Sequence, residues 1–191
     1  MNISTFIVLG IIVLAAGYAV ILYNNLVALK HRVAKAWSNI DVLLKQRHDE
    51  LPKLVETCKQ YMNYEQETLE QVIRARSLVS SARESQDIEA LGKAETQLRA
   101  GLGRLFALAE SYPDLKANSS FQHLQSRISD LEDAIADRRE LYNEAVNLNN
   151  IRIEQFPDLL IARMFAFKPF TLLVFSEEEK ADVDLGQLFK R

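Results

Sequence analysis

Phe6–Tyr23 reads FIVLGIIVLAAGYAVILY, an unbroken run of eighteen apolar, aromatic or glycine residues. It lies within a longer stretch, Met1–Leu29, that contains no Asp, Glu, Lys, Arg or His. At about 1.5 Å per helical residue the run reaches roughly 27 Å, and extending it back to Ile3 closes the gap to the roughly 30 Å hydrocarbon core of a bilayer. The sequence therefore predicts one membrane-spanning helix over residues 1–23.

The residues at the end of this run predict its orientation. Lys30, Arg32 and Lys35 follow it, whereas no charged side chain precedes it. Positive residues near a span tend to stay cytoplasmic, so we expect a single-pass protein of the inner membrane with its N-terminus outside and its body in the cytoplasm; a periplasmic body is the alternative. A cleavable signal peptide would have a positively charged start and a shorter apolar core of about 7 to 15 residues. Neither feature is present in the sequence, so we expect the anchor to be retained. The amphipathic rings of Tyr18 and Tyr23 are expected at the membrane interface.

The composition of the remaining chain limits its function. About 165 residues follow the anchor, enough for one domain with its own core. Charge is nearly balanced, with 23 basic against 26 acidic residues, which gives no electrostatic case for nucleic acid. Cys58 is the only cysteine, so no internal disulfide can form. Six glycines and four prolines in 191 residues leave few places to turn, and we expect long helices.

Three stripes of apolar residues at helical spacing predict an antiparallel, coiled-coil-like bundle over residues 24–155. The first stripe is Leu26, Leu29, Val33, Trp37, Ile40, Leu44, Leu51, Leu54, Cys58 and Met62. The second is Ile88, Leu91, Ala94, Leu98, Leu102, Leu105 and Ala109. The third is Phe121, Leu124, Ile128, Leu131, Ile135, Arg138, Tyr142, Ala145 and Asn149. The fold class is therefore all-α, with no strand expected before residue 150.

The helix ends predict a path of three long helices, running up, down and up. The first continues from the anchor towards Ser80, with Pro52 kinking or dividing it. Ser85-Gln86-Asp87 can cap the second helix, and Ser119 with Gln122 suggests a capping box for the third, which ends near Phe156-Pro157. On this path the end of the third helix lies far from the membrane.

The segment after the bundle is unusually apolar. Residues 156–175 read FPDLLIARMFAFKPFTLLVF, with five of the nine phenylalanines of the chain. Arg163, Lys168 and Pro169 argue against a second span. The segment either covers one end of the bundle or forms a docking surface for another subunit, a partner or a second membrane surface. Residues 176–191 form an acidic tail, interpreted as a solvated connector.

The sequence contains none of the usual catalytic or metal-binding patterns. The histidines at 31, 48 and 123 are isolated, and the chain has no HExxH motif, cysteine pair or GxSxG elbow. We therefore expect no enzyme, no metal and no cofactor.

Four polar residues stand out as candidates for fixing helix register or subunit number. Arg47 and Arg138 occupy positions where an apolar stripe favours a hydrocarbon side chain, and Asn143 and Asn147 repeat on one helix face with Asn150. Buried, such groups can set register. Exposed, they are solvated side chains, and we favour this second interpretation.

Several blocks of the sequence, over residues 23 to about 170, carry a resemblance to a known family. The early blocks are YNNLV (Tyr23–Val27), Arg32-Val33, AWSNIDVLLK (Ala36–Lys45) and RHDELPKLVET (Arg47–Thr57). The later blocks are LFALAE (Leu105–Glu110), YPDLKAN (Tyr112–Asn118), Phe121 with Leu124-Gln125, Tyr142-Asn143 with Ala145-Val146, and Phe156-Pro157. The departures are Ala166 for a usual glycine, Asp158-Leu159-Leu160 for a usual Asn after Phe-Pro, and Tyr64 for a usual His before Glu65. These blocks resemble those of the LemA family. The resemblance implies a bacterial envelope-associated protein with one N-terminal helix, a long-helix bundle and no established enzymatic activity.

Together these features predict a non-enzymatic, membrane-anchored helical scaffold that self-assembles into a homo-oligomer in the bacterial envelope. The anchor concentrates copies in one plane, and long seams favour repeated contact. By residue type and place, the candidate assembly contacts are Trp37, Phe165, Phe167 and Phe170. The expected partners are the lipid bilayer and further copies of the chain. The alternative is a membrane-tethered adaptor that presents its helical body to another membrane protein, such as a protease or sensor kinase.

Overall fold

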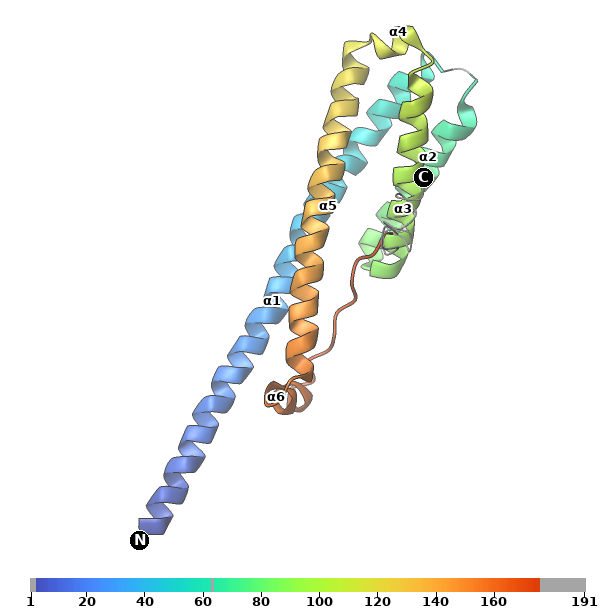
Figure 1. The fold of residues 1–191 in the computed structure, drawn as a ribbon. Coiled ribbons are helices and arrows are strands. Elements are labelled where there is room, and N and C mark those ends of the chain that lie inside the picture. Colours follow the sequence, from blue (N-terminus) through green and yellow to red (C-terminus); the bar gives the residue numbers. More distant parts are fainter. Residues whose placement is uncertain (1–2, 63, 176–191) are drawn as a thin grey trace, which may run out of the picture. The chain divides into compact units, whose positions relative to one another are not determined.

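The computed structural model describes residues 3–62 and 64–175, and within these ranges the chain is helical with no strand. The six helices, labelled in Figure 1, are α1 (Ile3–Lys59), α2 (Gln66–Ser85), α3 (Ile88–Ala109), α4 (Pro113–Lys116), α5 (Ser119–Glu154) and α6 (Asp158–Met164). The all-α fold, with a long apolar N-terminal helix packing against later helices, is confirmed. The acidic tail at 176–191 lies outside the described residues.

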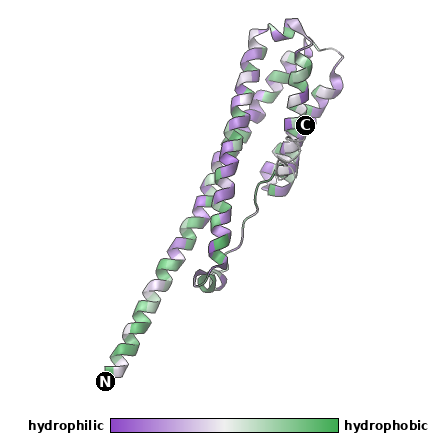
Figure 2. Ribbon diagram, viewed as in Figure 1, coloured by the Kyte–Doolittle hydropathy of each residue, from purple (hydrophilic) through white to green (hydrophobic). Residues whose placement is uncertain are grey.

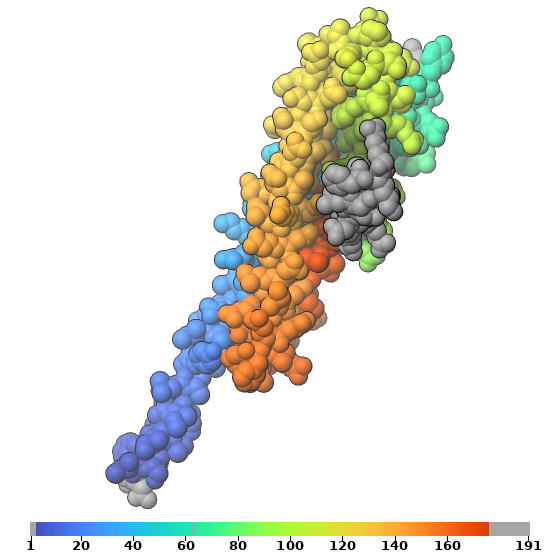
Figure 3. Space-filling view, in the orientation of Figure 1, coloured from blue at the N-terminus to red at the C-terminus, as the bar shows by residue number. Residues whose placement is uncertain are grey.

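The N-terminal part of α1 has the properties of a membrane span. Within the described ranges, α1 is the one helix long and apolar enough to cross a bilayer, and only 6% of its most apolar window is buried. Its N-terminal turns are mostly hydrophobic in Figure 2, and no other helix covers them on the face shown in Figure 3. A core helix of a soluble protein would be mostly buried, so this exposure indicates a membrane anchor.

The described residues fall into two compact units, and α1 and α5 contribute to both. The first unit comprises residues 3–39 and 140–172, and includes α6. In it α5 lies antiparallel to α1, since Trp37 contacts Tyr142 while Leu22 and Leu26 pack with Ile153.

The second unit comprises residues 40–139 and 173–175, and contains α2, α3 and α4. Its core includes Ile40, Leu44, Leu51, Leu54, Cys58, Leu91, Leu98, Leu105, Leu115, Phe121 and Ile128. Burial raises the pKa of the Cys58 thiol to about 12, as expected for an unreactive core cysteine.

The predicted stripes are largely the buried ones. On α5 every predicted position is buried except Arg138, and on α3 every one is buried except Ile88, which is half-buried. Asp87 caps α3 as expected, because its carboxylate accepts a hydrogen bond from the Ala90 amide at 2.9 Å. At the start of α5 the capping residue is one position earlier than predicted. The side chain of Asn118, not that of Ser119, accepts a hydrogen bond from the Phe121 amide at 3.0 Å.

The predicted path of three long helices is wrong. Helix α1 passes through Pro52 and ends at Lys59, and Gln66 starts a separate helix that forms an antiparallel hairpin with α3. Gln86 makes the turn between them in a left-handed conformation, with φ 54°. The additional reversal means that α5 returns antiparallel to α1, so the prediction that the C-terminal segment lies far from the anchor is also wrong. Phe165 contacts Tyr23, the last residue of the apolar run.

Candidate functional surfaces

The first unit carries a surface groove between α1 and α5. Its two adjoining parts have volumes of about 590 and 220 Å³ and share Arg32 and Leu148. Its lining on α1 comprises Asn25, Ala28, Leu29, Arg32, Lys35, Ala36 and Asn39. Its lining on α5 comprises Leu141, Glu144, Ala145, Leu148, Ile151, Arg152 and Gln155. The groove therefore presents a largely polar face of α1, which includes Ala28 and Ala36, beside a face of α5 that carries Leu141, Leu148 and Ile151.

The groove has the spacing of a helix-packing seam. On α5, residues 141, 144, 148, 151 and 155 alternate between steps of three and four, and residues 25, 28, 32, 35 and 39 of α1 do the same. Leu141, Leu148 and Ile151 are exposed, whereas the other α5 seam, which includes Tyr142 and Asn149, is buried against its own chain. A second seam of this period suits a further helix laid along the pair.

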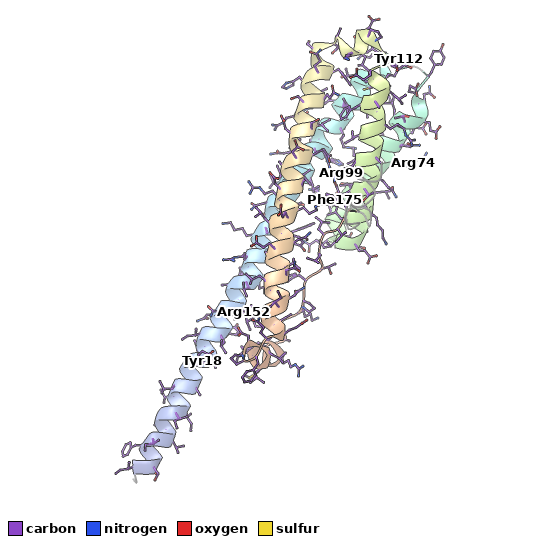
Figure 4. The ribbon with its side chains drawn as sticks, in the orientation of Figure 1. Tyr18, Arg74, Arg99, Tyr112, Arg152 and Phe175 are labelled. Carbon is purple, nitrogen blue, oxygen red and sulfur yellow. The ribbon has the colours of Figure 1, made fainter. Side chains whose placement is uncertain are left out.

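An aromatic cluster joins the end of the apolar run to the Phe-rich segment. The ring of Tyr23 lies 4.7 Å from that of Phe165 and 6.0 Å from that of Phe167, centroid to centroid. These rings line a cleft of about 520 Å³ together with Lys30, His31 of α1 and residues 166–170. Tyr18, the other predicted interface residue, is exposed on α1 (Figure 4).

Two polar side chains of α5 fix the Phe-rich segment to the first unit. The Asn150 side chain bonds both backbone groups of Phe170, and the Tyr142 hydroxyl donates to the Thr171 carbonyl at 3.0 Å. Burial raises the pKa of Tyr142, so this hydroxyl stays protonated and can donate. From Phe167 to Phe170 the segment therefore packs on its own chain.

The candidate assembly contacts are partly used within the first unit. Trp37 is half-buried and meets Tyr142 edge-on at 5.9 Å, and Phe167 and Phe170 are half-buried. Phe165 is more than half exposed, although its ring touches Tyr23. Their role between copies stays a prediction.

The end of the segment belongs to the second unit. The guanidinium groups of Arg139 and Arg99 lie 4.2 and 5.9 Å from the centre of the Phe175 ring, and Figure 4 labels Arg99 and Phe175. The backbone of Val174 lies directly against Gly92 of α3.

The four register candidates are placed very differently. Arg47 is only 1% exposed and its guanidinium binds the carboxylates of Glu95 and Glu132, so the expectation that it is solvated is wrong. Arg138 and Asn147 are exposed and Asn143 is half-buried. Arg47, Glu95 and Glu132 form an ionic cluster that joins α1, α3 and α5 within the second unit through the one cation of Arg47.

Burial and charge act in opposite directions on this cluster. Burial alone would lower the pKa of Arg47, but attraction by Glu95 and Glu132 outweighs it and raises the pKa, so the guanidinium stays charged. Burial raises the pKa of Glu95, and attraction by Arg47 offsets only part of that effect. Arg99 adds a second cation, its Nε 3.5 Å from Glu132. The arrangement holds α1, α3 and α5 together within the second unit.

Glu95 is a buried polar residue that the apolar stripe did not predict. It lies four residues after Leu91 and three before Leu98, which puts it on the buried face of α3 beside Ala94. An acid at a seam position, opposite a basic residue at a seam position of another helix, was the available signal. Among the described residues, no group of three or more His, Cys, Asp or Glu side chains is arranged to hold a metal ion.

Comparison with known sequences decides the family. The sequence model of the LemA family matches residues 36–185, which is most of the chain. The chain belongs to the LemA family. The match begins beyond the apolar part of α1 and takes in the bundle and the Phe-rich segment.

Relatives of this LemA family chain include proteins of two kinds. Protein LemA of Metamycoplasma hominis is 29% identical over 167 residues, covering 86% of this chain and 74% of that protein. Magnetosome protein MamQ 2 of Paramagnetospirillum magneticum is 39% identical over 67 residues, or 35% of this chain and 25% of that protein. MamQ of Magnetospirillum gryphiswaldense is 34% identical over a stretch of the same length. The chain thus spans about a quarter of the length of the magnetosome proteins it matches.

Proposed function

We propose that this protein is a non-enzymatic, membrane-anchored helical scaffold whose copies assemble laterally in the bacterial envelope. The observation that carries the proposal is the α1–α5 groove, with Leu141, Leu148 and Ile151 exposed at seam spacing. A stripe of apolar side chains at this period on a helix is normally covered by another helix. In this chain the stripe is left exposed.

A second copy of the chain is the occupant that we favour. The anchor holds every copy in one plane and in one orientation, which raises the local concentration of identical grooves. Ala28 and Ala36 leave room for close approach, and Glu144 lies across from cationic Arg32 and Lys35 on the groove lining. A symmetric contact of this kind uses the same surface on both copies.

Orientation and position complete the proposal. Lys30, Arg32 and Lys35 after the span favour a cytoplasmic body, anchored by a single pass in the inner membrane. Trp37 and the phenylalanines at 165, 167 and 170 remain candidate contacts between copies. In this proposal the ionic cluster serves only to hold α1, α3 and α5 together.

The test is size-exclusion chromatography with light scattering on the detergent-solubilised full-length protein. We expect an oligomer, and we expect the triple variant L141S/L148S/I151S to shift it towards the monomer. The matched control is L78S, which changes an exposed apolar residue of α2 in the second unit. A strictly monomeric wild type would overturn the proposal, and so would a triple variant that assembles as well as the control.

The adaptor hypothesis makes a different prediction. If the groove receives a helix of another membrane protein, crosslinking in cells gives one dominant foreign adduct and few self-adducts. Self-adducts as the main product support the scaffold.

A further inference from the structure

The outer face of α6 is apolar, which is the reverse of a normal surface helix. Leu160 and Met164 are one helical turn apart and are 58% and 68% exposed, and Phe156, just before the helix, is 79% exposed. We call Phe156, Leu160, Met164 and Phe165 the α6 patch. Clustered large apolar side chains of this kind mark a contact surface.

The inner face of α6 packs against the end of the anchor. Ile161 and Ala162 are buried in one cluster with Leu22 and Leu26 of α1, and Phe167 and Ala19 border that cluster. Arg152 of α5 lies 3.6 Å from the buried Asp158 at the start of α6, which further holds the short helix in place. The patch is therefore fixed beside the last turn of the apolar run.

The level of this contact along α1 indicates what covers the patch. A span from Ile3 to Tyr23 is about 31 Å long at 1.5 Å per residue, which matches the hydrocarbon thickness of a bilayer. Tyr23 then lies at the boundary with the headgroups, and Phe165 touches its ring. Apolar side chains held at this level face the region where interfacial helices bury their apolar face, about 5 to 10 Å into the membrane.

The polar residues around the patch fit the same surface. Arg163 is exposed on the same short helix, and Lys30 and Lys168 line the cleft that contains Tyr23 and Phe165. Cations next to an apolar face are typical of helices that lie among lipid headgroups.

We propose that α6 and the adjoining turn form an interfacial element, and that the α6 patch is buried in the surface of the same bilayer that holds α1. This inference goes beyond self-assembly, since it assigns the patch to lipid and leaves the α1–α5 groove to the second copy. It gives the first unit two attachments to the membrane, a span and an adjacent surface contact.

The experiment uses the full-length protein in vesicles of phosphatidylcholine and phosphatidylglycerol with brominated acyl chains, which quench nearby tryptophan. Trp37 is the only tryptophan of the chain, so W37F/L160W places a single reporter on the patch. The native protein is one control, because Trp37 lies fourteen residues, or about 21 Å of helix, beyond Tyr23. W37F/I12W, within the apolar run, is the other.

We expect brominated lipid to reduce the emission of W37F/L160W and to leave that of native Trp37 nearly unchanged, because only the first reporter lies at the level of the acyl chains. W37F/M164W should behave like W37F/L160W. Quenching of W37F/I12W without quenching at 160 and 164 would overturn the inference and leave the anchor intact. Quenching at none of the three positions would also contradict the assignment of α1 as a membrane anchor.

Discussion

The side-chain amide of Asn150 forms hydrogen bonds with both backbone groups of Phe170. Its Nδ2 donates to the Phe170 carbonyl at 2.9 Å, and its Oδ1 accepts from the Phe170 amide at 2.9 Å. A side-chain amide satisfies both groups of an irregular segment that has no ladder of its own. This double contact fixes the point at which the chain leaves the aromatic cluster.

Replacing Asn150 should release that segment. N150A removes two hydrogen bonds worth about 1 kcal/mol each, which corresponds to a roughly thirtyfold increase in local opening. Limited proteolysis with chymotrypsin, followed by mass spectrometry of cleavage after Phe170, measures it. N147A, at an exposed position on the same helix, should cleave like the wild type. Equal rates for the two variants would contradict the role of Asn150.

Removing Arg47 should destabilise the second unit strongly. R47M leaves Glu95, which is fully buried, without its cation, and a broken buried pair costs about 3–5 kcal/mol. R47M/E95L, which removes both members, should be more stable than R47M alone. Thermal unfolding followed by circular dichroism in detergent measures both.

The matched control for Arg47 is R138M, at the exposed arginine of the α5 seam. Its effect should stay within about 0.5 kcal/mol. An R47M variant no less stable than R138M would show that the ionic cluster does not hold α1, α3 and α5 together.

Replacing Gly92 of α3 with alanine should lower the stability of the protein, whereas the same change at Gly103 should raise it. A Cβ at Gly92 would lie 2.0 Å from the Val174 carbonyl oxygen, so G92A must displace residues 173–175 and should cost about 1–3 kcal/mol. At Gly103 nothing lies within 4 Å, and G103A should stabilise the helix by up to about 1 kcal/mol. Urea unfolding in detergent compares them. A harmless G92A would mean that the segment does not pack on α3.

Stability should fall as pH drops below 6.5 because of His48. Arg76 donates a hydrogen bond to the His48 ring at 2.6 Å. Burial first and the charge of Arg76 second lower the pKa of His48 below its usual value of 6.5. Below pH 6.5 the unfolded chain therefore binds the proton more readily than the folded chain, so acidification favours unfolding.

The midpoint of thermal unfolding at several pH values between 7 and 5 tests this dependence. H48Q should flatten it, whereas H123Q, at an exposed histidine of α5, should leave it as in the wild type. An unchanged slope in H48Q would assign the effect to another group.

The seams were predictable because helical period and burial act together. On α5 the stripe from Phe121 to Asn149 is buried at every predicted position but Arg138, since a helix packed along its neighbour must bury one face. The anchor was equally clear, because hydrocarbon thickness sets the length of the apolar run.

The turns and the polar contacts were not predictable to the same degree. The break between Lys59 and Gln66 contains no glycine or proline, so the usual signal for a reversal is missing. The partners of Arg47 and Asn150 lie 48 and 20 residues away, and only tertiary packing brings Glu95 and the Phe170 backbone to them. Such contacts leave no periodic pattern.

Disulfide crosslinking in isolated membranes tests self-assembly through the α1–α5 groove most directly. Cys58 is the only native cysteine, so C58A/L148C and C58A/N147C each carry one reporter, on the groove and about 100° around the same helix. We predict that mild oxidation gives a covalent dimer at position 148 and little at 147. No dimer at 148, or equal dimer at both positions, would contradict assembly through this groove.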